Sequence, residues 1–109
     1  MDLIKGTVDM LILRALAWEP MHGYGVSEWI RGRTGGTLQL QDAALYQALR
    51  RLESREWVAA EWGVSENNRR ARYYELTTAG RRQLKRETAE WCRYAAAVTA
   101  VLEPLQREV

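Results

Sequence analysis

Cysteine is nearly absent from this chain of 109 residues, in which Cys92 stands alone. A single cysteine excludes a disulfide within the chain and fits a reducing compartment. Long apolar runs are absent too, because none reaches the roughly 18 residues of a membrane-spanning helix. The first residues lack the basic start, apolar stretch and cleavage site of a secretory leader. We therefore expect a cytoplasmic protein that has no membrane partner.

Side chains that carry enzyme chemistry are scarce as well. The one histidine, His22, has no nucleophile and orienting acid suggested beside it, as a catalytic histidine would need. No cluster of Cys, His, Asp and Glu has metal-ligand spacing, and no glycine-rich phosphate loop follows a strand. The sequence predicts a protein that is not an enzyme and holds no metal or cofactor. We interpret His22 as a structural residue of a tight turn and Cys92 as a buried or half-buried thiol.

The charge of the chain is nearly balanced in total, at +2, but it is unevenly distributed. Residues 50–86 hold ten Lys and Arg against five acidic residues, whereas the remainder holds six against nine. Nearly all the cations are arginines, whose planar guanidinium suits phosphate and guanine. The local excess indicates an anionic partner.

Apolar spacing predicts three helices in the first half of the chain. The first, over residues 5–18, is apolar on nearly all sides, so it needs cover on more than one face, and a second subunit is the simplest source. The second spans residues 26–33, and the third spans residues 42–55 behind an N-cap at Asp42. A very short strand is predicted at residues 37–40, where leucines alternate with polar residues.

The third predicted helix has two different faces. Its apolar stripe consists of Leu45, Ala48, Leu49 and Leu52. The opposite face is polar, basic and aromatic, with Tyr46, Gln47 and Arg50 at its centre and Arg51 at its edge. Arg and Gln are side chains that read guanine and adenine edges. Tyr46 either reaches a DNA phosphate with its hydroxyl or packs at the helix surface.

A period of two then predicts a β-hairpin of residues 58–62 and 72–76, with a basic tip between them. A helix of about 25 residues follows, capped by Thr77 and ended near Leu102 by Pro104. Its apolar positions have heptad spacing, which is typical of a helix that pairs with another. They are Leu84, Thr88, Trp91, Ala95, Val98, Leu102 and Leu105.

This order of elements predicts an α+β, mostly α fold: a winged helix-turn-helix with a long C-terminal dimerisation helix. In that design the third helix enters the DNA major groove, and the hairpin, or wing, touches the backbone or minor groove. We expect residues 1–77 to form the DNA-binding domain and residues 78–109 the dimerisation helix, in one compact unit. The alternative is a winged-helix module that binds proteins, which the arginines on helix and wing disfavour. The tryptophans outside the last helix are interpreted as core or half-buried: Trp18, Trp29, Trp57 and Trp62.

Several short motifs, in their order and spacing, resemble the short form of the PadR family of transcriptional regulators. They are Lys5-Gly6-Thr7, His22-Gly23-Tyr24-Gly25, Leu45-Tyr46, Arg51-Leu52-Glu53, Glu61-Trp62-Gly63 and Arg72-Tyr73-Tyr74. The resemblance implies a homodimeric bacterial repressor, associated with the nucleoid, that binds palindromic operator DNA. It implies dimerisation through the last helix against the partner's first helix. Gln47 departs from the proline that is common there in the family and adds a base-reading side chain.

Two sets of site residues follow from the pattern and the resemblance together. DNA contacts are predicted for Lys5, Thr7, Tyr46, Gln47, Arg50, Arg51, Asn68, Arg69, Arg70, Arg72 and Tyr73. The dimer and effector surface is predicted at Leu11, Leu84, Trp91, Ala95, Val98 and Leu102. In some relatives an aromatic residue at the place of Trp91 lines a pocket for a small aromatic or phenolic ligand. The alternative is that Trp91 only packs the dimer interface.

Overall fold

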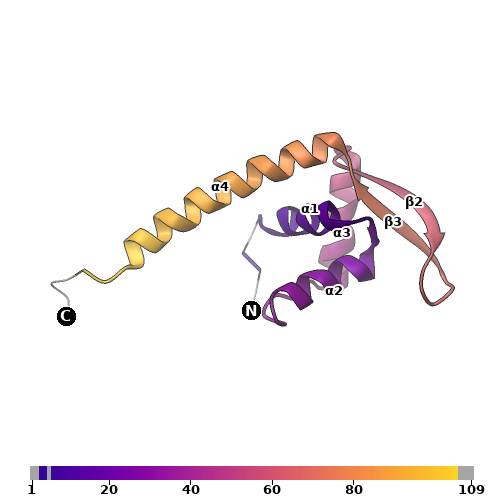
Figure 1. Cartoon of the computed structure of the whole chain (residues 1–109), viewed down its shortest axis with the longest axis horizontal. Coiled ribbons are helices and arrows are strands. Elements are labelled where there is room, and N and C mark those ends of the chain that lie inside the picture. Colours follow the sequence, from indigo (N-terminus) through magenta and orange to yellow (C-terminus); the bar gives the residue numbers. More distant parts are fainter. Residues whose placement is uncertain (1–2, 5, 106–109) are drawn as a thin grey trace.

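The computed structural model describes residues 3–4 and 6–105 of the chain (Figure 1). Within these residues the chain forms four helices and three strands. In chain order they are α1 (Val8–Trp18), β1 (Met21–His22), α2 (Gly23–Arg33), α3 (Asp42–Ser54), β2 (Val58–Val64), β3 (Arg70–Leu76) and α4 (Thr78–Leu102). The helices, the hairpin and the long last helix agree with the elements that the sequence predicts, and the mostly helical fold class is confirmed.

The core lies where α1, α2 and α3 meet one face of the sheet. From α3, the four residues of the predicted apolar stripe are all buried, and α1 contributes Ile12, Leu13, Ala15 and Leu16. The sheet contributes Val58, Tyr74 and Leu76. Burial of apolar side chains at helical spacing fixes the rotation of α3, so its polar residues face outward.

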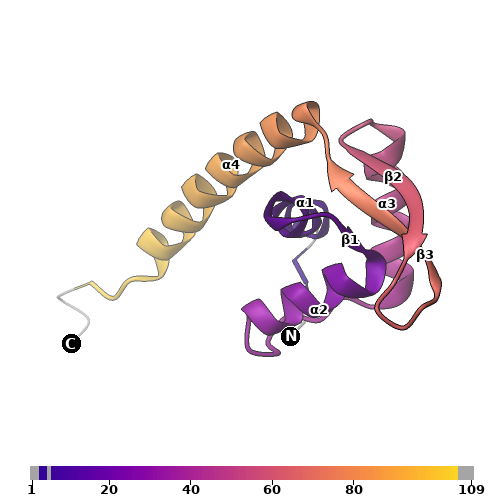
Figure 2. The ribbon, with the colours of Figure 1, turned by 45° about the vertical axis from the view of Figure 1, so that its right-hand side comes forward.

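The sheet corrects one prediction. Its strand order is β1-β3-β2, all antiparallel, and β1 pairs Met21 with Tyr74 and His22 with Tyr73 (Figure 2). The predicted strand at residues 37–40 is wrong, because that segment is a loop. The Thr34 hydroxyl oxygen accepts the Leu38 N–H at 3.0 Å, and Gly35 and Gly36 both have positive φ. These turn contacts occupy the backbone that a strand would need for pairing.

Both helix caps that the sequence predicts can be compared with the structure. The N-cap of α3 is Gln41, and Asp42 is the first helical residue, so the predicted cap is off by one position. Thr77 caps α4 as predicted, because its hydroxyl oxygen accepts the Gly80 N–H at 3.0 Å. The same hydroxyl donates to the Glu56 carbonyl at 2.8 Å and ties the start of α4 to the turn after α3.

The last helix gives the molecule its elongated shape, with extents of 61 × 28 × 21 Å. The first half of α4 passes over α1, and its C-terminal half projects from the body (Figure 1). The helix ends at Leu102, two residues before Pro104, as predicted. On the projecting half, Val98, Val101 and Leu102 are exposed. Among the described residues, no helix is long and apolar enough to cross a membrane.

Several predictions of burial are wrong. Trp18 and Trp62 are 66% and 58% exposed, and Cys92 is exposed on α4. Trp29 and Trp57 are half-buried, as expected. Trp62 lies near the turn of the hairpin, two residues before the end of β2. Cys92 follows Trp91 directly and lies at the flank of the row of heptad positions, one helical turn after Thr88.

Candidate nucleic-acid interface

The outer face of α3 carries the side chains that the sequence predicts to read bases. Tyr46, Gln47 and Arg50 are all exposed there. Tyr46 lies against the start of α2, since a Cβ built on Gly23 would come within 2.7 Å of the Tyr46 hydroxyl oxygen. Gly23 therefore permits a close approach of α2 and α3 at this end of the face. The Tyr46 side chain is still 43% exposed.

The wing presents basic side chains beside this face. Its turn is closed by the Ser65 N–H, which donates to the Arg69 carbonyl at 2.8 Å, and by the Asn68 N–H, which donates to the Ser65 carbonyl at 2.9 Å. Asn68 has φ of 59°, a conformation that asparagine tolerates better than most residues. The turn leaves Asn68, Arg69 and Arg70 exposed at the tip.

Arg70 is held by an aromatic ring rather than by an acid. Its guanidinium carbon lies 4.4 Å from the centroid of the exposed Trp62 ring. A cation over an aromatic face is attracted by the ring electrons, and the contact leaves the guanidinium edge able to bind an anion. The exposed tryptophan therefore supports a basic side chain on the wing.

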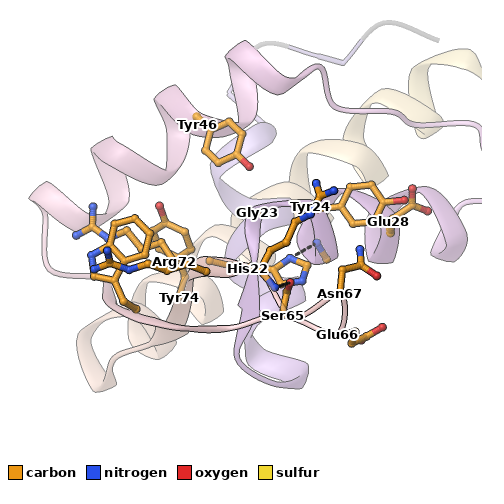
Figure 3. A pocket seen from close by; sticks show the side chains of 15 residues that line it. His22, Gly23, Tyr24, Glu28, Tyr46, Ser65, Glu66, Asn67, Arg72 and Tyr74 are labelled. Atoms are coloured by element: carbon orange, nitrogen blue, oxygen red, sulfur yellow. Dashed lines mark hydrogen bonds between the residues drawn. The ribbon is translucent and has the colours of Figure 1, made fainter.

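A groove of about 750 Å³ separates the wing from α3 and the start of α2. Figure 3 shows Tyr46 on one side of it, the wing residues Ser65, Glu66 and Asn67 on the other, and His22 between them. His22 holds the start of α2, because its Nδ1 accepts the Gly25 N–H at 3.0 Å. The structural role predicted for this histidine is confirmed.

Two of the predicted DNA-contact arginines are engaged in ion pairs. Arg51 Nη2 lies 2.6 Å from Asp9 Oδ1 of α1, and Arg72 Nη2 lies 2.6 Å from Glu53 Oε2 of α3. Within the described residues, no ion pair engages Arg50, Arg69 or Arg70. Arg50, Arg69 and Arg70 are thus the cations best placed to bind phosphate or bases.

Tyr73, Thr7 and Lys5 do not join this set. Tyr73 is half-buried on the sheet face opposite to Tyr74, where its hydroxyl donates to the Val64 carbonyl at 3.2 Å. Thr7 lies at the start of α1 beside Trp91 of α4, and its hydroxyl donates to the Ile4 carbonyl at 2.7 Å. Lys5 lies outside the described residues. A DNA contact from Tyr73 or Thr7 remains a prediction without support from this geometry.

A second hollow, of about 320 Å³, lies between the start of α1 and α4. Met10, Glu87, Trp91 and Tyr94 line it, and the two aromatic rings are 6.1 Å apart. Burial raises the pKa of the Glu87 carboxyl, and the negative charges of Asp9 and Glu90 act in the same direction. Trp91 thus lies at a cavity edge, as an effector contact would require.

The remaining residues of the predicted dimer surface follow α4 outward. Leu11, Leu84 and Ala95 are half-buried, with Leu11 and Leu84 packed against the core. Val98 is 38% exposed and Leu102 is 75% exposed. Exposure rises along the seam because the body of the chain covers only its first half.

Comparison with known proteins assigns the chain to a family. The sequence profile described as "Transcriptional regulator PadR-like family" matches residues 12–86, which is more than half of the chain. The chain belongs to the PadR family. PadR proteins are DNA-binding transcription regulators and not enzymes, so the chain is a transcription regulator of this kind.

Relatives of this PadR chain share both sequence and fold. Protein X of Lysinibacillus sphaericus is 30% identical over 105 residues, which is 96% of each chain. A transcriptional regulator from Clostridium thermocellum has a similar structure, with a TM-score of 0.84, 29% identity, and coverage of 94% of this chain and 100% of that one. A PadR family transcription regulator from Clostridium difficile R20291 gives a TM-score of 0.77 at 27% identity, covering 90% of this chain and 100% of that one.

The structure also adds groove residues that sequence reasoning missed. Tyr24 is 68% exposed at the start of α2 and lines the groove next to Glu28. The motif His22-Gly23-Tyr24-Gly25 contains it, but from the sequence alone a tyrosine between glycines is interpreted as a packing residue. Its place at the groove depends on the position of α2 in the fold.

Over the part of the chain that the structure describes, no three or more His, Cys, Asp or Glu side chains gather as metal ligands would.

Proposed function

We propose that this PadR protein is a homodimeric repressor that binds palindromic double-stranded DNA. The observation that carries the proposal is that Tyr46 of α3 faces Arg69 and Arg70 of the wing across one groove. Gln47 and Arg50 are exposed on the same helix. Side chains that form bidentate contacts to bases lie on the helix, and cations suited to phosphates lie on the hairpin.

In the proposed complex, α3 enters the major groove and the wing follows the backbone or the minor groove. Arg50 reads a guanine and Gln47 reads an adenine, because each forms paired hydrogen bonds to those base edges. Arg69, Arg70 and Asn68 contact phosphates or the minor groove. The proposal keeps the domain assignment predicted from the sequence, in which residues 1–77 bind DNA and residues 78–109 form the dimer.

The dimer is proposed on the apolar seam of α4. Val98 and Leu102 are exposed on a projecting helix, and a row of apolar side chains in water is stabilised when another helix covers it. A second copy would supply its own α4 and α1. Two copies then hold their α3 helices near one turn of DNA, or about 34 Å, apart.

An effector site is proposed at the hollow that Trp91 lines. A small aromatic or phenolic molecule would stack on the Trp91 and Tyr94 rings, which are 6.1 Å apart. Its binding would favour one spacing of the two α3 helices over another and so release the operator. Regulation of this kind takes place at the bacterial nucleoid in the cytoplasm.

The test uses a duplex of about 30 base pairs, long enough for two half-sites, that the protein itself selects from a random library. Binding is measured by fluorescence anisotropy at about 150 mM salt against a scrambled duplex of equal composition. We expect the selected duplex to bind at least a hundredfold more tightly. Equal affinity for both duplexes would contradict the proposal. An affinity for DNA that does not change with salt concentration would favour a module that binds proteins instead.

A further inference from the structure

Arg51 differs from Arg50, its neighbour on α3, because its guanidinium is paired with an acid of another helix. Its Nη2 lies 2.6 Å from Oδ1 of Asp9, a residue 42 positions earlier in the chain. Asp9 belongs to the first turn of α1, and α1 packs under α4. The pair therefore joins the helix that faces DNA to the helix that supports α4.

The acid of this pair is less exposed to water than the acids of the Arg31–Glu28 and Arg72–Glu53 pairs, which are 39% and 32% exposed. The Asp9 side chain is only 19% exposed, although Arg51 is 49% exposed. The ion pair between Arg31 and Glu28, within α2 alone, has exposures of 52% and 39%. Partial burial reduces the screening that makes exposed pairs weak, so the Asp9–Arg51 contact can hold two helices in a defined relation.

We propose that the Asp9–Arg51 pair positions α3 for reading DNA. Arg51 is then a positioning residue and not a phosphate contact. The inference rests on the proposed DNA-binding function and adds the contact that holds α3 against α1.

The test measures affinity and salt dependence for the selected and scrambled duplexes. Asp9→Asn and Arg51→Gln are each expected to lower affinity for the selected duplex about five- to tenfold, with the double variant no weaker than either one. Affinity for the scrambled duplex and the salt slope stay as in the parent. Arg31→Gln, which removes the exposed pair within α2, is the control and leaves both affinities unchanged.

A phosphate contact by Arg51 would give the opposite pattern. Arg51→Gln would then weaken both duplexes and reduce the salt slope by about 0.9, whereas Asp9→Asn would strengthen binding because a negative charge is lost. That result overturns the inference. An equal loss of affinity for both duplexes in Asp9→Asn also overturns it, because it would show that the pair supports folding only. If the parent itself does not discriminate between the duplexes, the proposed function fails instead.

Discussion

Arginines that look equivalent in the sequence occupy three different environments in the structure. Arg50 is exposed on α3, Arg70 stacks on Trp62, and Arg51 and Arg72 pair with carboxylates. Charge alone does not separate these roles, because each depends on what lies within a few ångströms of the guanidinium. The proposed base contact and the proposed phosphate contacts can therefore be tested individually.

Arg50→Ala and Arg69→Ala are expected to weaken DNA binding in different ways. Loss of Arg50 removes a base contact and relaxes sequence preference at one position, with a cost of about 1–3 kcal/mol on the selected duplex alone. Loss of Arg69 weakens all duplexes alike and lowers the salt slope by about 0.9. Competition binding at several salt concentrations separates the two outcomes. The reverse pattern would exchange the proposed roles of α3 and the wing.

Glu87 is expected to make stability depend on pH. Burial raises the pKa of its carboxyl in the folded chain, so the folded state favours the protonated form. The stabilisation is complete below the unfolded pKa of about 4.3 and is lost as the pH rises through the folded pKa. Glu87→Gln therefore raises the melting temperature at pH 7 by a few degrees and removes this part of the pH dependence.

The measurement is thermal unfolding followed by circular dichroism between about pH 4 and pH 8. Glu75→Gln, an exposed residue of β3, is the control for removing one negative charge. If both variants gain the same stability at pH 7, net charge and not the burial of Glu87 is the cause.

Elements with a repeated pattern were predictable from the sequence, and elements without one were not. The stripe of Leu45, Leu49 and Leu52 fixed both the extent and the rotation of α3, because apolar residues at helical spacing have one stable placement. The strand β1 has only two residues and no pattern, so its pairing with β3 depends on tertiary contacts alone. The Asp9–Arg51 pair spans 42 positions and likewise leaves no local signal.

The crossing of α4 over the base of the hairpin depends on Gly80. A Cβ there would lie 2.0 Å from the Trp57 carbonyl oxygen, which is main chain and cannot move aside cheaply. Gly80→Ala is expected to destabilise the protein by about 2–3 kcal/mol, the cost of overpacking. Thermal unfolding at fixed protein concentration measures the effect.

Gly32 offers a matched control for that change. It lies near the end of α2, and a Cβ there would meet nothing within 4 Å. Gly32→Ala is expected to stabilise the protein by about 0.5–1 kcal/mol, since alanine favours a helix more than glycine does. If both alanine variants destabilise alike, steric contact with Trp57 is not the reason for glycine at position 80.

At the scale of the whole molecule, the body and the projecting helix differ in how well the chain itself buries their apolar side chains. The core of α1, α2, α3 and the sheet is closed within one chain. The seam of α4 is half-buried at Leu84 and Ala95 and is exposed at Leu102. A small chain that buries a limited share of its surface gains stability from a partner. The local sequence predicts this seam through its heptad spacing, and the structure shows how much of it the chain itself leaves uncovered.

Charges placed on the seam are expected to separate the proposed dimer. The double variant Val98→Asp with Leu102→Asp puts two carboxylates where apolar side chains of two copies would meet, and burying them unpaired costs several kcal/mol. Sedimentation velocity at micromolar concentration is expected to give a dimer for the parent and a monomer for the variant. Ala100→Asp, on the exposed opposite side of α4, stays dimeric. A parent that sediments as a monomer, or a double variant that remains a dimer, contradicts the interface proposed on this seam.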